Sequence, residues 1–204
     1  MKTPYFFDKI ETIKVYDPLA EVLGAFSDGS YEFSYEDIVK SAGHSCPTVA
    51  GAYICTQVAL KTLYPEQSAV RGKIEVSFNA PLEEGVTGVI SNVITQITGA
   101  TDKSGFKGLN GKFARHSLMH FANVNSKEIL SITFTRMDNE KSVKVVYDPS
   151  SVKPDPNMMD LMPKMLQGQA TVEELSEFAS LWQDRVKRIF DNVGSVVKVT
   201  RLES

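Results

Sequence analysis

The sequence predicts an α+β protein in which a mixed or antiparallel sheet is packed with helices. Residues 47–64 carry apolar side chains at helical spacing. Residues 74–78 alternate apolar and polar side chains, as a half-buried strand does. Further strand patterns gather at 118–147, and this order of elements indicates the α+β class.

The first forty residues mix short extended and helical segments. Extended stretches are expected at 9–16 and 31–33, with a short helical segment at 18–26 between them. A helix at 34–40 follows, because Glu36 and Asp37 occupy a first turn, where the helix dipole favours acidic side chains.

The helix at 47–64 has clear boundaries. Pro47 suits the first turn, where its missing N–H costs nothing, and Pro65 ends the pattern. The apolar stripe of this helix consists of Val49, Tyr53, Thr56, Leu60 and Leu63. Gly51 and the neighbouring alanines are small, so another element is expected to approach this helix closely.

The middle of the chain predicts a sheet and one more helix. The strand at 74–78 is followed by a helix from Val86 to Ile97, which Gly99 ends. Residues 101–112 form a flexible basic loop that contains three glycines and three lysines. Strands are expected at 118–122, 129–136 and 142–147, the last two joined as a hairpin.

The C-terminal part begins with the proline-containing linker at 149–157. A short helix follows whose Met158, Met159, Met162 and Met165 favour adaptable packing or a dimer surface. A capping box at 171–174 opens a longer helix with Trp182 expected in the core, and 196–199 suggests a closing strand. We therefore expect a core with an N-terminal extension at 1–148, and a linker, helical segment and closing strand at 149–204.

Composition excludes several classes of protein. The chain has 204 residues, 42% of them hydrophobic and 23% charged, with a net charge of −3. This balance argues against a nucleic-acid partner, which would require a basic surface. The sequence shows neither a membrane span nor a secretory signal at its start, so the expected location is the cytoplasm.

Two cysteines, Cys46 and Cys55, are present. Nine residues of helix separate their Cα atoms by about 13 Å, whereas a disulfide tolerates about 7 Å at most. Both are therefore expected as thiols, as a reducing compartment favours, and Cys55 is expected in the core.

The stretch His44-Ser45-Cys46-Pro47 is the main candidate site. In an extended segment, side chains two residues apart face the same side, so His44 and Cys46 could converge on one metal ion. Cys46 would also lie at the positive end of a helix, which favours a thiolate and makes it a candidate catalytic nucleophile. The alternative is a helix cap with a buried thiol.

His116 and His120 are the remaining histidines, and either could complete a metal site. In a helix their rings would lie about 6 Å apart on one face. In a strand they would stand about 13 Å apart, and at most one would join a given site. Mixed nitrogen and sulfur ligands leave zinc, nickel, iron or copper open, and haem is a further option.

Charged residues supply weaker candidates. Glu83 and Glu84 precede a predicted helix, where they complement its dipole or could act as a ligand or general base. Lys107 and Lys112 in the glycine-rich loop could bind an anionic carrier or a phosphate-bearing cofactor. The loop's glycines match neither dinucleotide-binding nor P-loop spacing.

Gly43-His44-Ser45-Cys46-Pro47, followed by Gly51 and a helix, resembles the signature of the FmdE family, which takes its name from a component of formylmethanofuran dehydrogenase. The likeness continues through the strand at 74–78, the helix end at 97–101 and the glycine-rich loop, and it returns at 165–175. It covers residues 36–192.

The resemblance implies an α+β core that tends to form homodimers and that holds a metal, most simply zinc, near His44 and Cys46. Only these two residues carry over from the family's site. Ala100 occupies the position of the family's second cysteine, and residues 79–84 differ from its acidic stretch. The Cys-rich zinc finger found at the C-terminus of some members has no counterpart here.

Two functions follow from these features. The first is a metal-dependent enzyme or enzyme subunit that acts on a small one-carbon or carrier-bound substrate, with an open metal position activating water or polarising a carbonyl. The second is a non-catalytic metal- or haem-binding accessory protein, which the small number of titratable groups favours slightly. A metal-free Cys46 nucleophile with His44 as its base is a third.

Overall fold

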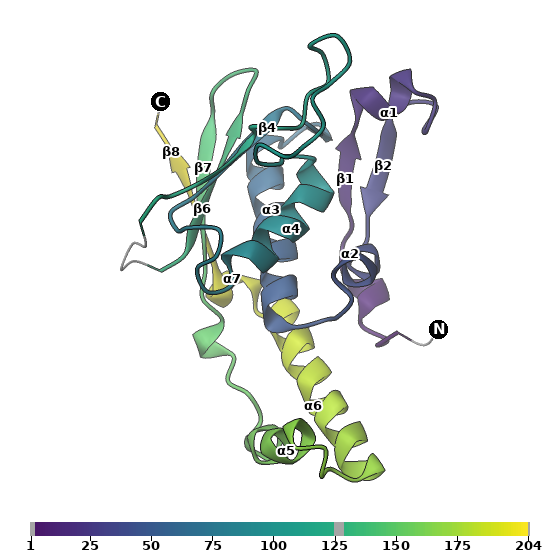
Figure 1. Cartoon of the computed structure of the whole chain (residues 1–204), viewed down its shortest axis with the longest axis vertical. Helices are drawn as coiled ribbons and strands as arrows, with labels where there is room; N and C mark the ends of the chain where they lie inside the picture. Colours follow the sequence, from purple (N-terminus) through teal and green to yellow (C-terminus); the bar gives the residue numbers. More distant parts are fainter. Residues whose placement is uncertain (1–2, 125–128, 204) are drawn as a thin grey trace.

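The computed structural model describes residues 3–124 and 129–203. They form an α+β fold with two mixed sheets (Figure 1). The N-terminal elements are η1 (Phe7–Lys9), β1 (Ile13–Tyr16), α1 (Pro18–Val22), β2 (Ser30–Phe33), α2 (Tyr35–Ala42), α3 (Pro47–Leu63) and β3 (Ala69–Val70). The middle elements are β4 (Ile74–Phe78), α4 (Thr87–Thr98), β5 (Met119–Phe121), β6 (Ser131–Arg136) and β7 (Ser142–Tyr147). The C-terminal elements are η2 (Pro149–Ser151), α5 (Pro156–Leu166), α6 (Val172–Asp191), α7 (Val193–Val196) and β8 (Val197–Leu202).

The larger sheet has the strand order β5-β4-β6-β7-β8, and the smaller sheet has the order β2-β1-β3. Strands β4 and β5 are parallel, and the other pairs in the larger sheet are antiparallel. In the smaller sheet β1 pairs antiparallel with β2 and parallel with β3. Both sheets are therefore mixed. In the larger sheet β4 comes first along the chain, and the C-terminal strand β8 forms the edge next to β7.

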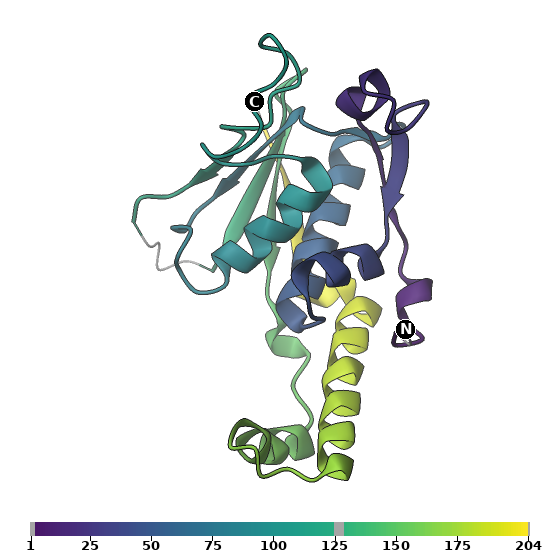
Figure 2. The same cartoon turned by 45° about the vertical axis from the view of Figure 1, so that its right-hand side comes forward.

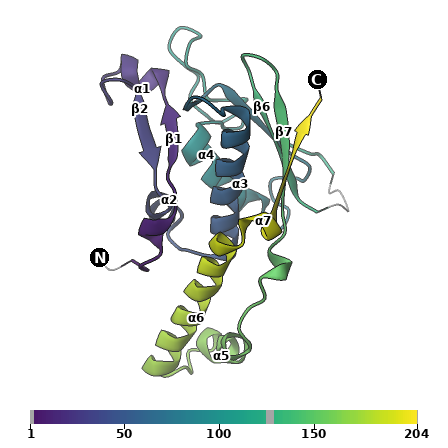
Figure 3. The ribbon, with the colours of Figure 1, turned by 180° about the vertical axis from the view of Figure 1, so that it is seen from behind.

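Helix α3 lies between the two sheets (Figures 1 and 3). The predicted stripe is buried, but so is nearly every residue from Val49 to Thr56. The reason is that α2, α4, α6 and strand β7 all contact α3, so water reaches it mainly at its C-terminal half, where Lys61 is exposed. The predicted close approach occurs at Gly51, whose Cα lies against the ring of Tyr147.

Most predicted elements are found, with shifted ends. The helix predicted at 18–26 ends at Val22, because the chain turns at Gly24, which has a φ of 70°. The extended stretch predicted from residue 9 begins only at Ile13, after the 3-10 turn η1. Strand β3 was not predicted, since two residues are too short to show alternation.

Helices α5 and α6 extend away from the body of the fold, with α5 beside the far end of α6 (Figure 2). The C-terminal half of α6 returns to the core, where Val186 and Ile189 are buried. Within residues 3–124 and 129–203, no helix combines the length and apolar character needed to cross a bilayer.

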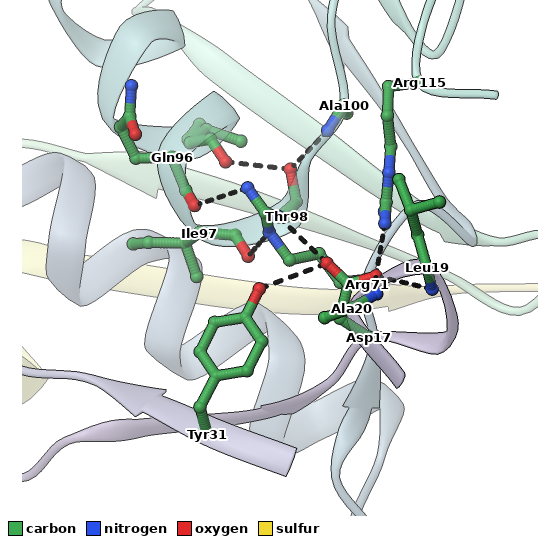
Figure 4. A network of polar contacts seen from close by, with 11 residues as sticks. Asp17, Leu19, Ala20, Tyr31, Arg71, Gln96, Ile97, Thr98, Ala100 and Arg115 are labelled. Atoms are coloured by element: carbon green, nitrogen blue, oxygen red, sulfur yellow. Dashed lines mark hydrogen bonds and ion pairs between the residues drawn. The ribbon is translucent and has the colours of Figure 1, made fainter. Parts of the chain in front are cut away.

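A buried ion cluster joins the smaller sheet to the segment between α4 and β5 (Figure 4). Asp17, at the end of β1, is 3% exposed. Its carboxylate accepts hydrogen bonds from Arg115 Nη2 at 2.5 Å, Arg71 Nη1 at 3.0 Å and the Tyr31 hydroxyl at 3.1 Å. It also caps α1 by accepting from the backbone N–H of Leu19 and Ala20. This single carboxylate therefore fixes three separate segments of chain.

Arg115 reaches Asp17 past two glycines, Gly72 and Gly99, with φ values of 75° and 74°. A Cβ atom at Gly72 would lie 2.0 Å from Arg115 Nη1. Within the described residues, that buried nitrogen has no hydrogen-bond partner. The two glycines are thus required both by their backbone conformation and by the space that the guanidinium occupies.

Replacing Gly51 with alanine is expected to destabilise the fold. The new Cβ would lie 2.3 Å from two carbons of the Tyr147 ring, so the ring must move. Tyr147 would then lose its 2.7 Å hydrogen bond to the Pro47 carbonyl. We expect the free energy of unfolding to fall by about 1–3 kcal/mol in urea denaturation. Gly194→Ala in α7 is the control, because nothing lies within 4 Å of its Cβ, and it should leave stability unchanged or raise it.

Asp17→Asn is expected to lower the free energy of unfolding at neutral pH by about 3 kcal/mol, because it leaves buried Arg115 without a counter-charge. Burial raises the pKa of Asp17, but the Arg71 hydrogen bond and the Arg115 charge together lower it by more, so the pKa lies below its usual value. The carboxylate's contribution is therefore complete above the unfolded-state pKa of about 3.9 and is lost as pH falls through the lower folded-state pKa.

Urea denaturation of both proteins at pH 7 and in acid measures this effect. The difference between wild type and Asp17→Asn should begin to shrink below about pH 4, where the carboxylate of the unfolded chain becomes protonated. It should disappear only as pH falls through the lower folded-state pKa. Asp160→Asn, at an exposed position of α5, is the control and should match wild type throughout. Equal stability of Asp17→Asn and wild type at pH 7 would contradict the role assigned to the cluster.

Candidate functional site

The segment from Gly43 to Pro47 joins α2 to α3. Helix α2 ends at Gly43, whose φ of 77° turns the chain, and Pro47 occupies the first turn of α3, as predicted. Cys46 is the N-cap of α3, and its Sγ accepts a hydrogen bond from the Val49 N–H at 3.4 Å. The predicted position of the thiol at the positive end of this helix is therefore confirmed.

His44 is exposed, and its ring is oriented by the backbone. Its Nδ1 lies 3.1 Å from the carbonyl oxygen of Ala42. A carbonyl can only accept a hydrogen bond, so Nδ1 carries the proton and Nε2 of the neutral ring has a free lone pair. Nε2 can thus accept a hydrogen bond or a proton, or bind a metal ion.

A pocket of about 350 Å³ adjoins His44 between α2 and α4, and we call it the His44 pocket. Buried Ile38 and Val93 supply its apolar part, and exposed Asn92 and Gln96 supply amide groups. The remaining lining residues are Ser41, Ala42, Val89 and Thr95. Apart from the imidazole, the lining holds no ionisable side chain.

Ser45, between the two candidate ligands, is held by α2 and α6. Its hydroxyl lies 3.0 Å from the Tyr35 hydroxyl and donates to Gln183 Oε1 at 3.0 Å. Its carbonyl accepts from Trp182 Nε1 at 2.9 Å. Burial raises the pKa of Tyr35 well above its usual value, so this phenol stays protonated and can donate. These bonds fix the segment that carries His44 and Cys46.

Cys46 is 9% exposed and belongs to the hydrophobic core. His44 borders the His44 pocket and Cys46 does not, so that pocket does not receive both predicted ligands. Both cysteines are free thiols, as expected. Cys55 is fully buried, as predicted for a core residue, and this burial raises the pKa of its thiol to about 12.

The other histidines lie elsewhere. His116 is in the loop before β5, with Nδ1 3.1 Å from the Ser117 hydroxyl. His120 is an exposed residue of β5, next to Met119, whose sulfur lies 3.9 Å from the Thr95 hydroxyl of α4. Neighbouring residues of a strand point to opposite faces, so His120 faces away from α4 and its pocket. Neither residue lines the His44 pocket.

The charged candidates are all exposed. Glu83 and Glu84 lie in the turn before α4, and the Glu84 carbonyl accepts from the Thr87 N–H. Lys107 and Lys112 lie in the loop between α4 and β5. Within the described part of the chain, none of these four side chains forms an ion pair, so the fold leaves them in solvent.

The described residues do not fit a metal held by protein ligands alone. No group of three or more His, Cys, Asp or Glu side chains in 3–124 and 129–203 is placed to hold an ion. Cys46 caps α3 and is buried in the core away from the His44 pocket, and Ala100, fully buried, offers no ligand. Of the predicted ligands His44, Cys46, His116 and His120, His44 is the one that lines the His44 pocket.

No known family model matches the chain, and no curated protein matches it either.

Several polar residues of this region were not singled out from the sequence. Asp17, Arg71 and Arg115 come from three distant segments, and Gln183 meets Ser45 across 138 positions. Neither set has a local spacing that could have revealed it. One indication of the contact with α6 came from the sequence, namely the amphipathic pattern of 172–191, which predicted that Trp182 faces the core. In the structure Trp182 is partly buried and packs against the core.

Cys46→Ala and Cys46→Ser separate the capping role of this residue from other roles. Serine is a good N-cap, so Cys46→Ser should retain wild-type stability. Alanine cannot accept the Val49 N–H bond, so Cys46→Ala should lower the free energy of unfolding by about 1 kcal/mol. Thermal and urea denaturation measure both. An equal loss in the two variants would show that the thiol stabilises the protein in some way other than the cap.

Proposed function

We propose that the protein binds a small, neutral, hydrogen-bonding molecule in the His44 pocket, in the manner of an FmdE-type protein. The observation that carries this proposal is the orientation of His44. Its Nδ1 donates to the Ala42 carbonyl, so Nε2 is the ring nitrogen that remains available to a bound molecule. An oriented imidazole beside a concave pocket is a common arrangement in ligand and active sites.

The lining of the pocket favours a particular class of molecule. Asn92 and Gln96 offer amide donors and acceptors, and Ser41 offers a hydroxyl, whereas the Thr95 hydroxyl donates to the Ala100 carbonyl. Lysine and arginine are not among the lining residues, so nothing there would neutralise a phosphate or a carboxylate. The volume of about 350 Å³ suits a small molecule or the end of a larger carrier.

The proposal includes the metal ion that the FmdE resemblance implies, but with fewer protein ligands than that resemblance suggests. An ion would have His44 as its one ligand from the pocket, and the bound molecule or water would complete its coordination, as in an open site. With a single titratable group at the pocket, binding is better supported than catalysis. We therefore favour an accessory role in the cytoplasm, with a homodimer as the working assembly.

His44→Ala should abolish binding, because the exposed ring supplies Nε2 without supporting the fold. The probe is formamide, a neutral donor and acceptor, titrated into ¹⁵N-labelled protein. We expect the side-chain amide signals of Asn92 and Gln96 to shift in wild type and to stay unchanged in His44→Ala. The matched controls are His116→Ala and His120→Ala, which remove imidazoles outside the pocket and should behave as wild type.

The same titration with Zn²⁺ tests the metal. Elemental analysis and an absorption spectrum of untagged protein, purified without chelator, show any retained ion or haem. Metal lost in His44→Ala and retained in Cys46→Ser would support an ion bound through His44 alone. Formamide and Zn²⁺ responses that are absent in wild type, or identical in wild type and His44→Ala, would refute the proposal.

A further inference from the structure

Helices α5 and α6 form a projecting unit, here called the arm and defined as residues 156–183 (Figures 1 and 2). Between the two helices lies a groove of about 470 Å³, here called the arm groove. Its principal lining residues are Met162, Met165 and Leu166 of α5 and Phe178, Ala179 and Trp182 of α6. The arm groove therefore brings two thioether side chains and two aromatic rings to one open cavity.

The methionines of α5 differ in their surroundings. Met158 is 1% exposed, so it serves for packing, as the sequence favours. Met162 and Met165 are only partly buried, and they line the open arm groove instead. Met159 is 48% exposed. The sulfur atoms of these last three residues are therefore not needed to fill the interior of the protein, and a solute can reach them.

The three accessible methionines recur at intervals of three residues along α5, at Met159, Met162 and Met165. Residues three apart in a helix are neighbours on its surface, with about 5–6 Å between their Cβ atoms. A methionine side chain has three rotatable bonds, so neighbouring thioethers can converge on one point. The helix thus offers three sulfur ligands on adjacent turns, two of them inside the arm groove.

Trp182 is held in a fixed orientation on the α6 side of the arm groove. Its Nε1 donates to the Ser45 carbonyl at 2.9 Å, so the indole N–H is already used. Gln183 also lines the groove, but both ends of its amide bond to Ser45. The Phe178 ring lies one helical turn away, 5.8 Å from the Trp182 ring between centroids. Helix α6 therefore offers a ligand aromatic surface, which attracts cations.

We propose that the arm groove binds one Cu(I) ion, with Met162 and Met165 as thioether ligands and the Trp182 ring beside the ion. Met159 supplies a third sulfur from the adjacent turn of α5. Soft thioether sulfur selects Cu(I). All of these groups are uncharged, which suits a monovalent ion better than a divalent one. The ion enters and leaves as Cu(I), so no electron transfer is involved.

The lining of the arm groove disfavours other metals. Zinc prefers imidazole and thiolate, and magnesium and calcium prefer carboxylate oxygen. None of these ligand types is among the lining residues, and neither is lysine or arginine, whose charge would repel a cation. Lys164, which lies between Met162 and Met165 in the sequence, pairs with Glu174 at 2.6 Å, so its charge is compensated. The site is thus distinct from the metal expected at His44, which would use imidazole nitrogen.

Silver titration of the full chain tests the proposal. Ag(I) has the charge of Cu(I) and the same preference for thioether sulfur, and it is stable in air. Thiols also bind Ag(I), so the titration uses Cys46→Ser as the parent protein. The remaining thiol, Cys55, is fully buried. The buffer contains no chloride, because chloride would precipitate the ion.

The ¹³C-labelled methyl groups of the methionines report where the ion binds. We expect the signals of Met159, Met162 and Met165 to shift and to saturate at one Ag(I) per chain. Met137, which is 43% exposed and lies outside the arm, should keep its signal. Trp182 is the single tryptophan of the chain, so its fluorescence should be quenched in proportion to the occupied arm groove.

Met162→Leu/Met165→Leu removes two sulfur atoms and keeps the apolar volume, so the fold should persist. We expect this variant to raise the Ag(I) dissociation constant at least about tenfold and to lose the quenching of Trp182. The matched control is Met137→Leu, which makes the same change at an exposed position outside the arm and should bind as the parent does. Cu(I), supplied without oxygen and measured by competition with bathocuproine disulfonate, should give the same order of affinities.

Several outcomes would overturn the proposal. These are Ag(I) affinity that is unchanged in Met162→Leu/Met165→Leu, methyl shifts that appear equally at Met137, or the same methyl shifts with Zn²⁺. An apolar molecule retained in native mass spectrometry, without any response to Ag(I), would overturn it by assigning the arm groove to that ligand. If the double variant does not fold, Met162→Leu and Met165→Leu are compared singly, and each should weaken binding.

The proposal for the arm groove and the proposal for the His44 pocket can fail separately. His44→Ala should leave the methyl shifts of the arm methionines unchanged, because His44 does not line the arm groove. Met162→Leu/Met165→Leu should likewise leave the formamide response of Asn92 and Gln96 unchanged.

Discussion

The burial of α3 between the two sheets is the constraint on which the rest of this structure depends. A helix of 17 residues that is apolar on almost every side is stable in water only when other elements surround it. Strands β7 and β8, β3 and helices α2, α4 and α6 fulfil this condition. Gly51 lets the Tyr147 ring lie against the helix backbone. Asp17 forms ion pairs with Arg71 and Arg115, and these link the smaller sheet to the segment after α4.

This constraint also decides what happens at the N-terminus of α3. The first turn of a buried helix needs acceptors for its free N–H groups, and Cys46 supplies one. The same turn of chain leaves His44 outside, where the Ala42 carbonyl sets its tautomer and α4 supplies the opposite wall of a pocket. The two side chains of the His-x-Cys motif therefore have different surroundings, although they are two residues apart.

Ser45 connects these local features to α6. Its side chain and carbonyl bond to Tyr35, Trp182 and Gln183, so one residue joins α2, α6 and the start of α3. Trp182 and Gln183 also line an apolar pocket between α5 and α6.

The sequence by itself determined the α+β class, most of the helices and strands, the α3 boundaries, the capping box at Thr171 and the position of Cys46 at a helix start. These features depend on residues near each other in the chain, through periodicity, proline geometry and capping. Tertiary structure alone decided that every residue of α3 from Val49 to Thr56 is buried, that Asp17 binds Arg71 and Arg115, that Ser45 meets Gln183, and that His44 borders a pocket without Cys46. Each of these depends on segments brought together by packing, and no local pattern records which distant segment will be the neighbour.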